Sequence, residues 1–358
     1  MIDCDVHNDW STAEVLLPYL DDYFRDFLIR GEKPGPRGTF PRAQRAWLHP
    51  EGFRRQDINP VTQDDHYNLM KEHLLDKYDI DVAILTGDET LDISTIANRY
   101  YGNALASAYN NWVIDEWLSR DRRLKGSIVI YSPDPENAAA EIRRVGEHPD
   151  MVQIIMSSGS IRPYGDPFYH PIWEAASQMN LPIAVHLGGQ AGINTQTFSS
   201  GPPTFYWEAH ALLCQAGMSH VASTIAHGVF EKWPNTYLIL TECGVSWFPT
   251  VLWRLDNDYR ALRKETPWLK RLPSEYARDH IRLTTQPLEN PDNKQHLWNV
   301  LETFDAKHTL LFSSDYPHWD FDDPTKIPIP ADWRENILDA NARQVYSRLP
   351  ARDSKSHS

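Results

Sequence analysis

Eight short apolar runs dominate this sequence, and segments with helical spacing separate most of them. The runs lie at residues 1–7, 82–85, 127–130, 152–156, 183–186, 237–242, 281–285 and 309–315. Short apolar strands that alternate with helices are typical of an α/β protein whose parallel sheet is buried on both faces. Eight such units predict a closed (β/α)8 TIM barrel. A doubly wound open sheet is the alternative, but no glycine-rich turn follows the first run to support a nucleotide-binding version.

Apolar residues at intervals of three and four predict the helices. Leu16, Leu20, Phe24 and Phe27 give this spacing after the first run. The predicted helical segments are 11–30, 64–79, 98–118, 134–147, 171–179, 205–232 and 293–304. We therefore expect residues 1–350 to form a single domain, followed by a flexible tail at 351–358.

Residues 31–63 interrupt this pattern with proline, glycine and arginine. A loop of this length inside a compact domain is usually a lid or a binding loop. We expect a lid after the first strand, in which Arg54 and Arg55 bind a substrate carboxylate through bidentate contacts. A solvated basic excursion on the surface explains the same residues equally well.

Composition excludes several classes of function. The chain of 358 residues carries 35 basic and 49 acidic residues, for a net charge of −14, which argues against binding to nucleic acid or to an anionic membrane surface. No apolar stretch reaches the roughly 18 residues that a membrane span needs. The three cysteines have no paired spacing and indicate neither disulfides nor a zinc knuckle. We expect a soluble cytoplasmic protein.

The first run places three ionisable groups on one face of a strand. Side chains alternate along a strand, so Asp3, Asp5 and His7 point the same way. Burying these groups costs free energy unless something satisfies them, and a divalent cation does so. Asp5 and His7 are therefore candidate metal ligands. For an isolated Asp-x-His motif, an edge strand with solvated charges is the commoner explanation.

The other strand ends favour the metal. In a parallel barrel the active site lies at the carboxyl ends of the strands. His186 ends the fifth run, Glu242 the sixth and Asp315 the eighth. Each alone has an ordinary explanation, as a buried histidine, a partner for an arginine or a turn cap. Together they form a set of imidazole and carboxylate ligands that suits divalent metals.

Several motifs resemble those of a known family. They are IDCDVH at 2–7, PIWE at 171–174, LPIAVH at 181–186, GVFEKWP at 228–234, SSDYPH at 313–318 and NAR at 341–343. Together they resemble the amidohydrolase superfamily, and within it the amidohydrolase-2 group related to aminocarboxymuconate semialdehyde decarboxylase. The resemblance spans nearly the whole chain. It implies metal ligation by Asp5, His7, His186 and Asp315, with Asp315 also acting as a base.

One position departs from the family pattern. Its decarboxylases usually have a catalytic histidine at the end of the sixth strand, where this chain has Glu242. Two further histidines, His210 and His318, are expected on the active-site side and could join Glu242 in holding a second metal. The sequence thereby also resembles a subgroup with dinuclear nonheme iron that hydroxylates small acids. The ordinary alternatives are that His210 packs on its helix and that His318 lies on a surface turn.

These observations leave three functional hypotheses. The main one is a metal-dependent enzyme that hydrolyses or decarboxylates a small carboxylate substrate, with Asp315, Glu242 and His210 as catalytic residues. The second is an oxygen-dependent hydroxylase with two ions, either diiron or mixed manganese and iron. The third is a non-catalytic subunit that holds zinc and pairs with an active homologue. We expect one or two ions of zinc, manganese or iron, and a homo- or hetero-oligomer.

Overall fold

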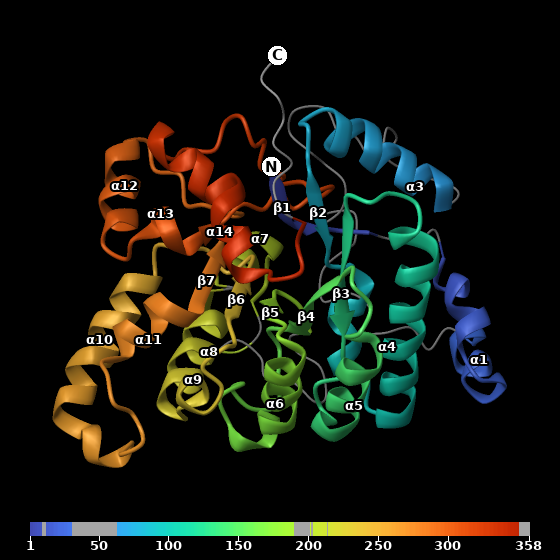
Figure 1. Ribbon diagram of the computed structural model, residues 1–358, viewed down its shortest axis with the longest axis horizontal. Coiled ribbons are helices and arrows are strands. Elements are labelled where there is room, and N and C mark those ends of the chain that lie inside the picture. Colours follow the sequence, from blue (N-terminus) through green and yellow to red (C-terminus); the bar gives the residue numbers. More distant parts are fainter. Residues whose placement is uncertain (9–11, 31–62, 190–200, 202, 213, 351–358) are drawn as a thin grey trace.

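Eight parallel strands form one sheet in the computed structural model, which describes residues 1–8, 12–30, 63–189, 201, 203–212 and 214–350 (Figure 1). The strands are β1 Ile2–Val6, β2 Val82–Leu85, β3 Leu124–Val129, β4 Met151–Ser157, β5 Ile183–His186, β6 Leu238–Thr241, β7 Ile281–Thr284 and β8 Leu310–Leu311. Each strand pairs in parallel with the next one in the chain, and every strand residue is buried. This consecutive order confirms the predicted TIM barrel and makes the open-sheet alternative wrong.

The last strand returns to the first and closes the barrel. Cys4 N donates to Phe312 O at 2.9 Å, Asp315 N donates to Asp5 O at 3.2 Å, and His7 N donates to Tyr316 O at 2.8 Å. β8 consists of only two residues, which pair with β7. The segment after β8 therefore continues alongside β1 and carries its polar residues to the carboxyl end of the barrel.

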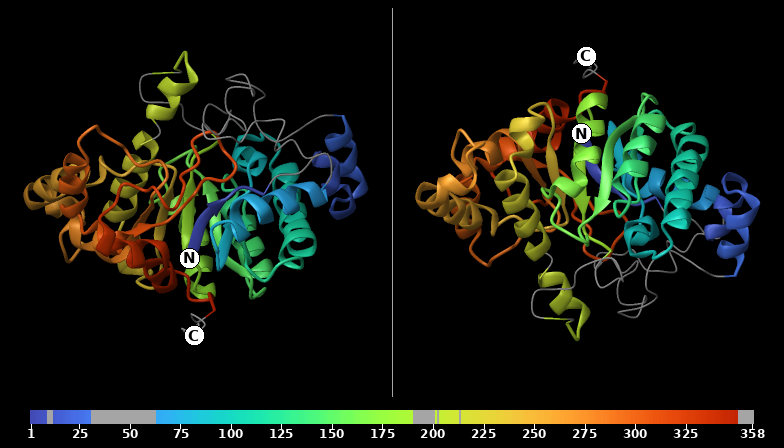
Figure 2. Two further views of the ribbon diagram at one scale, coloured as in Figure 1. Left: turned by 90° about the horizontal axis from the view of Figure 1, so that it is seen from above. Right: turned by 90° about the horizontal axis from the view of Figure 1, so that it is seen from below.

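Helices surround the strands, and in Figure 2 α1 lies at one end of the molecule while α10 and α11 lie at the other. Their bounds are α1 Asp22–Ile29, α3 Gln63–Met70, α4 Arg99–Val113, α5 Pro135–Val145, α6 His170–Met179, α7 Tyr206–Ala211, α8 Cys214–Ala226, α9 Val229–Lys232, α10 Phe248–Leu262, α11 Pro273–His280, α12 Lys294–Glu302, α13 Ala306–Thr309 and α14 Asn341–Val345. Each predicted helical segment overlaps with at least one of them. The predictions missed α10 and α11, which lie in the connection between β6 and β7, and the short helices α13 and α14.

Four of the predicted helices are interrupted. Segment 98–118 ends in a π-helix at Ile114–Leu118, and segment 205–232 contains the three helices α7, α8 and α9. Within 11–30, a 3-10 helix at Ala13–Tyr19 precedes α1, because Pro18 lacks the backbone N–H that a continuing α-helix needs. Within 64–79, α3 changes into a π-helix at Lys71–Asp76. Residues 31–62 of the predicted lid, which include Arg54 and Arg55, lie outside the described residues, as does the tail at 351–358. No described helix is long and apolar enough to cross a membrane.

Candidate metal centre

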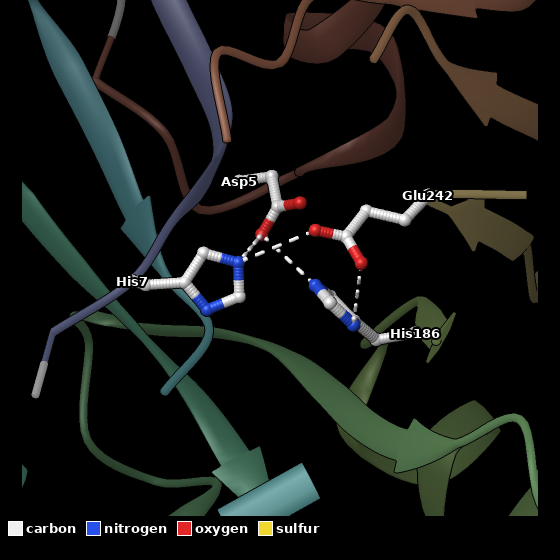
Figure 3. Close-up of side chains that lie close together, drawn as sticks. All are labelled: Asp5, His7, His186 and Glu242. Carbon is white, nitrogen blue, oxygen red and sulfur yellow. Dashed lines mark ion pairs between the residues drawn. The ribbon is translucent and has the colours of Figure 1, made fainter. Parts of the chain in front are cut away.

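Four side chains from the ends of three strands point toward one another at the carboxyl end of the barrel (Figure 3). Asp5 belongs to β1, His7 follows it, His186 ends β5 and Glu242 follows β6. All four are buried, and each offers a ligand atom within 4.8 Å of the others. His186 Nε2 lies 3.3 Å from Asp5 Oδ1, and His7 Nε2 lies 3.5 Å from Glu242 Oε1. The described residues therefore place a mixed carboxylate and imidazole cluster where a barrel carries its active site.

A second group overlaps the first. It contains His7, Glu242, Asp315 and His318, whose ligand atoms also lie within 4.8 Å of one another. Asp315 Oδ1 lies 2.6 Å from His318 Nδ1 and 2.9 Å from His7 Nε2. The resemblance implied that Asp315 completes the set of Asp5, His7 and His186, whereas the structure groups Glu242 with these three residues and Asp315 with His318.

Glu242 and Asp315 share an unusual backbone conformation. Their φ angles are +56° and +59°, in the left-handed region that side chains other than glycine seldom adopt. This conformation costs about 1 kcal/mol or more per residue and persists only where the surrounding structure imposes it. Glu242 directly follows β6, Asp315 lies in the segment beyond the end of β8, and both carboxylates reach the same buried space.

Backbone carbonyl groups orient both histidines of the first group. Gly87 O contacts His7 Nδ1, and Leu187 O lies 2.8 Å from His186 Nδ1. Because a carbonyl can only accept, each Nδ1 carries the proton and each Nε2 presents a lone pair to the cluster. This is the arrangement that a metal-ligating histidine requires.

Three polar atoms of the cluster indicate whether a divalent metal fits the site. Asp5 Oδ2, His7 Nε2 and His186 Nε2 are buried and have no hydrogen-bond partner among the described residues. Carboxylate oxygens nevertheless lie 2.9 Å from His7 Nε2 and 3.3 Å from His186 Nε2. A buried polar atom left unpaired costs about 1 to 3 kcal/mol. A divalent cation held among these side chains would satisfy both imidazole nitrogens and balance the Asp5 carboxylate, and this donor set suits manganese, zinc or iron. The residues present therefore fit a divalent metal.

The protonation of the cluster reflects burial and close charges. Burial and the charge of Glu242 raise the pKa of Asp315 well above its usual value. Burial acts to raise the pKa of Glu242 as well, but the surrounding imidazoles, chiefly His186, outweigh burial and lower it. For His318, burial acts to lower the pKa, but Glu242 and Asp88 raise it to about 9. The carboxylates and imidazoles of the cluster therefore share protons in the metal-free protein. A bound cation would displace these protons.

His210 lies apart from both ligand groups. Its Nε2 is 3.1 Å from Asp320 Oδ2, and Gln286 Nε2 donates to the same oxygen at 2.8 Å. Burial acts to lower the pKa of His210, but Asp320 raises it overall. The structure therefore pairs this predicted ligand with a carboxylate that the sequence interpretation missed. The only signal in the sequence was the position of Asp320 in the loop after the eighth strand.

Asp3 also lies outside the ligand groups. Its Oδ1 accepts from Ser314 N at 3.0 Å, and burial raises its pKa to about 7. This hydrogen bond of Asp3 holds the segment after β8 against β1, next to Asp315. The sequence interpretation also missed Thr86, whose Oγ1 donates to Asp5 Oδ1 at 2.6 Å, since no motif marks it.

Comparisons with known proteins find a family and relatives that match most of the chain. The family model named Amidohydro_2, described as amidohydrolase, matches residues 2–348. A gamma-resorcylate decarboxylase from Polaromonas sp. strain JS666 is 24% identical over 288 residues, which cover 76% of this chain and 82% of that protein.

Two solved structures are similar over almost the entire chain. A 2,6-dihydroxybenzoate decarboxylase complexed with 2,6-dihydroxybenzoate has a TM-score of 0.68 and 20% identity, covering 97% of this chain and 98% of its own. A 5-carboxyvanillate decarboxylase from Novosphingobium aromaticivorans, complexed with manganese and 4-hydroxy-3-methoxy-5-nitrobenzoic acid, has a TM-score of 0.69 and 17% identity, covering 97% and 95%. At these identities the two structures support the fold alone.

Proposed function

The chain belongs to the amidohydrolase family whose model matches residues 2–348, and from this premise we propose that it is a metal-dependent decarboxylase of a small aromatic carboxylate. The observation that carries the proposal is the buried cluster in which Asp5 Oδ2, His7 Nε2 and His186 Nε2 lack hydrogen-bond partners. The substrate class comes from the relatives, which act on hydroxylated benzoates.

We assign the ligands of one ion to Asp5, His7, His186 and Glu242. Manganese is the proposed metal because a structural relative binds it, while zinc and iron suit the same donor set. When bound, the cation polarises the substrate and stabilises the negative charge that develops on it. In this assignment Glu242 serves as a ligand at the strand end where related decarboxylases usually have a histidine.

Asp315 carries the proton in this proposal. The bond between the ring carbon and the carboxylate carbon breaks, its electron pair stays on the ring carbon, and Asp315 donates a proton there. The products are carbon dioxide and the decarboxylated arene. His318 Nδ1, 2.6 Å from Asp315 Oδ1, then returns a proton to Asp315. His210, held by Asp320, is a second proton donor on the same side of the barrel.

A second candidate function follows from the overlap of the two ligand groups. His7 and Glu242 belong to both groups, so Asp315 and His318 could complete a site for a second ion. Two neighbouring sites with carboxylate and imidazole ligands would suit iron, or manganese with iron, and would supply oxygen-dependent hydroxylation of a small acid. Decarboxylation remains the first choice because the relatives reported above are decarboxylases.

We also propose roles for residues outside the metal centre. Arg54 and Arg55 hold the substrate carboxylate, and residues 1–350 act as one domain. The protein works in the reducing cytoplasm, consistent with three cysteines that are all free. It assembles into a homo- or hetero-oligomer, which size-exclusion chromatography with light scattering would reveal.

Metal analysis combined with a substrate panel tests the function. Protein purified without chelators should hold about one equivalent of manganese or zinc per chain, and should release carbon dioxide from at least one hydroxylated benzoate. Chelation should abolish the activity and manganese should restore it. Two equivalents that include iron, with a hydroxylated product formed only in the presence of oxygen, would establish the second candidate instead. Stoichiometric metal without carbon dioxide release from any hydroxybenzoate would overturn decarboxylation.

A further inference from the structure

Two residues directly after β2 contact both candidate ligands of β1. Thr86 Oγ1 donates to Asp5 Oδ1 at 2.6 Å, and the Gly87 carbonyl accepts from His7 Nδ1. All four residues are buried. The Thr86 hydroxyl orients the carboxylate of Asp5 through Oδ1, the oxygen that lies 3.3 Å from His186 Nε2. The Gly87 carbonyl orients the ring of His7 and leaves its Nε2 for a cation.

The position of Gly87 depends in turn on Asn8 and Tyr109. Asn8 Oδ1 accepts from Gly87 N at 3.1 Å and from the Tyr109 hydroxyl at 3.1 Å. Two donors on one oxygen fix the orientation of the Asn8 amide. Tyr109 belongs to α4, so a continuous chain of hydrogen bonds runs from the helical layer through Asn8 and Gly87 to the ring of His7.

Close packing around Gly87 keeps this chain of hydrogen bonds in one geometry. Its φ is +72°, a conformation that strains any residue with a side chain. A Cβ atom at this position would lie 2.8 Å from Tyr109 Oη and would also collide with Thr90 Oγ1. The absent side chain therefore lets the Tyr109 hydroxyl approach Asn8 while the backbone turns its carbonyl toward His7.

We infer that Tyr109 is a positioning residue of the metal centre. Together with Asn8 it holds the Gly87 carbonyl against His7 Nδ1 and so keeps His7 Nε2 aimed at the metal. Thr86 does the same for Asp5. This inference rests on the metal site of the proposed function. Removing a hydrogen-bond partner behind a metal ligand typically weakens metal binding by about 10- to 100-fold.

Tyr109→Phe tests the inference, since it deletes the hydroxyl and keeps the ring. The affinity of the purified protein for Mn²⁺ should fall about tenfold in a chelator competition, and the visible spectrum of the Co²⁺-loaded protein should change. The matched control is Tyr276→Phe, because Tyr276 is also buried and its hydroxyl bonds Glu231 within the outer helical layer. The control should leave the Mn²⁺ affinity and the Co²⁺ spectrum unchanged.

Thr86→Val supplies an independent second variant. It keeps the shape of the side chain, removes the donor to Asp5 and should also weaken Mn²⁺ binding by about tenfold. Its control is Thr224→Val, since Thr224 is buried in α8 and donates to His220 O at 2.9 Å. Unfolding temperatures of the metal-free proteins accompany each measurement. A structural role alone would lower these temperatures in variant and control alike, without a selective loss of Mn²⁺ affinity.

The outcomes separate this inference from the function on which it rests. Selective weakening in Tyr109→Phe and Thr86→Val supports the positioning role. Parental Mn²⁺ affinity and an unaltered Co²⁺ spectrum in both variants would overturn it and leave the proposed metal site in place. A parent protein that binds no divalent metal would overturn the metal site itself, and the inference with it.

Discussion

The rings of His7 and His318 lie with their centroids 4.1 Å apart, although the two residues come from opposite ends of the chain. His7 follows the first strand of the barrel, and His318 lies in the segment after the last strand. Closure of the sheet between β8 and β1 brings the rings together. The candidate site is therefore a product of barrel closure.

His186→Ala should remove most of the bound metal and all of the activity. The substitution deletes one of four proposed ligands, and loss of the cation leaves the buried carboxylates of Asp5 and Glu242 without the charge that balances them. Metal content by mass spectrometry and carbon dioxide release check this together. Full metal content with an unchanged rate would contradict the assignment of His186.

Asp315→Asn should separate metal binding from chemistry. If Asp315 carries the proton, the variant should keep its metal and lose about 10²- to 10⁴-fold in kcat, because an amide cannot donate that proton. Equal metal content in the two proteins is the necessary control. A variant that loses the metal would instead show that Asp315 is a ligand, as the sequence motifs implied.

Glu242→Gln distinguishes the two candidate functions. With one ion, the variant should bind Mn²⁺ at least tenfold more weakly, because the charge that balances the dication is lost. With two ions, one should be lost and the other retained. Metal stoichiometry under matched conditions decides between these results, and Glu174→Gln on the exposed face of α6 is the control. Unchanged stoichiometry and affinity would remove Glu242 from the ligand set.

His220 should make the fold less stable in acid. Its Nδ1 accepts from Tyr164 N at 3.2 Å and its Nε2 donates to Ser158 O at 2.8 Å, which only the neutral ring can do. Burial lowers the pKa of His220 from 6.5 to about 4. The unfolded chain therefore takes up this proton first. The stabilising contribution of the neutral ring, about 3 kcal/mol, is complete above pH 6.5 and is lost as the pH falls toward 4.

Urea denaturation at pH 7 and at pH 4.5 measures this effect when His220→Gln is compared with the parent. Both proteins are kept in chelator, so that release of metal does not contribute. The parent should lose more free energy of unfolding than the variant over this interval. Equal losses would show that His220 does not account for the acid sensitivity.

Tyr346→Phe should reduce stability without affecting the metal. The Tyr346 hydroxyl donates to Gln153 Oε1 at 3.0 Å, and Gln153 Nε2 donates to Ser127 Oγ at 2.8 Å, all in buried surroundings. Loss of the hydroxyl leaves Gln153 Oε1 unpaired and should cost about 1 to 3 kcal/mol of unfolding free energy. Chemical denaturation gives this value, and Mn²⁺ titration gives the control. A stability equal to that of the parent would contradict the role of this bond.

The barrel and the strand-end residues were predictable because both depend on local pattern. Apolar runs mark the strands, and Asp5, His7, His186, Glu242 and Asp315 follow directly from where those runs end. The short extent of β8 was not predictable, since the apolar run at 309–315 continues beyond the ladder before the chain turns toward β1.

Contacts between separate helices and strands could not be predicted from the local sequence pattern. Thr86 and Gly87 act on β1 only because β2 pairs beside it, and Tyr109 reaches them from a helix. Likewise, the pairing of His210 with Asp320 joins the loops after β5 and β8. Such contacts form only in the closed barrel, and no residue spacing in the sequence predicts them.

Because β1 and the segment after β8 meet only when the sheet closes, the second ligand group cannot assemble while the ribosome still holds the last third of the chain. The proposed ligands of the ion lie at the ends of β1, β5 and β6, so metal loading would follow synthesis of the chain at least as far as Glu242. The bound ion would then link β1 to β5 and β6 across the carboxyl end of the barrel. Binding free energy would then add directly to the stability of the closed barrel.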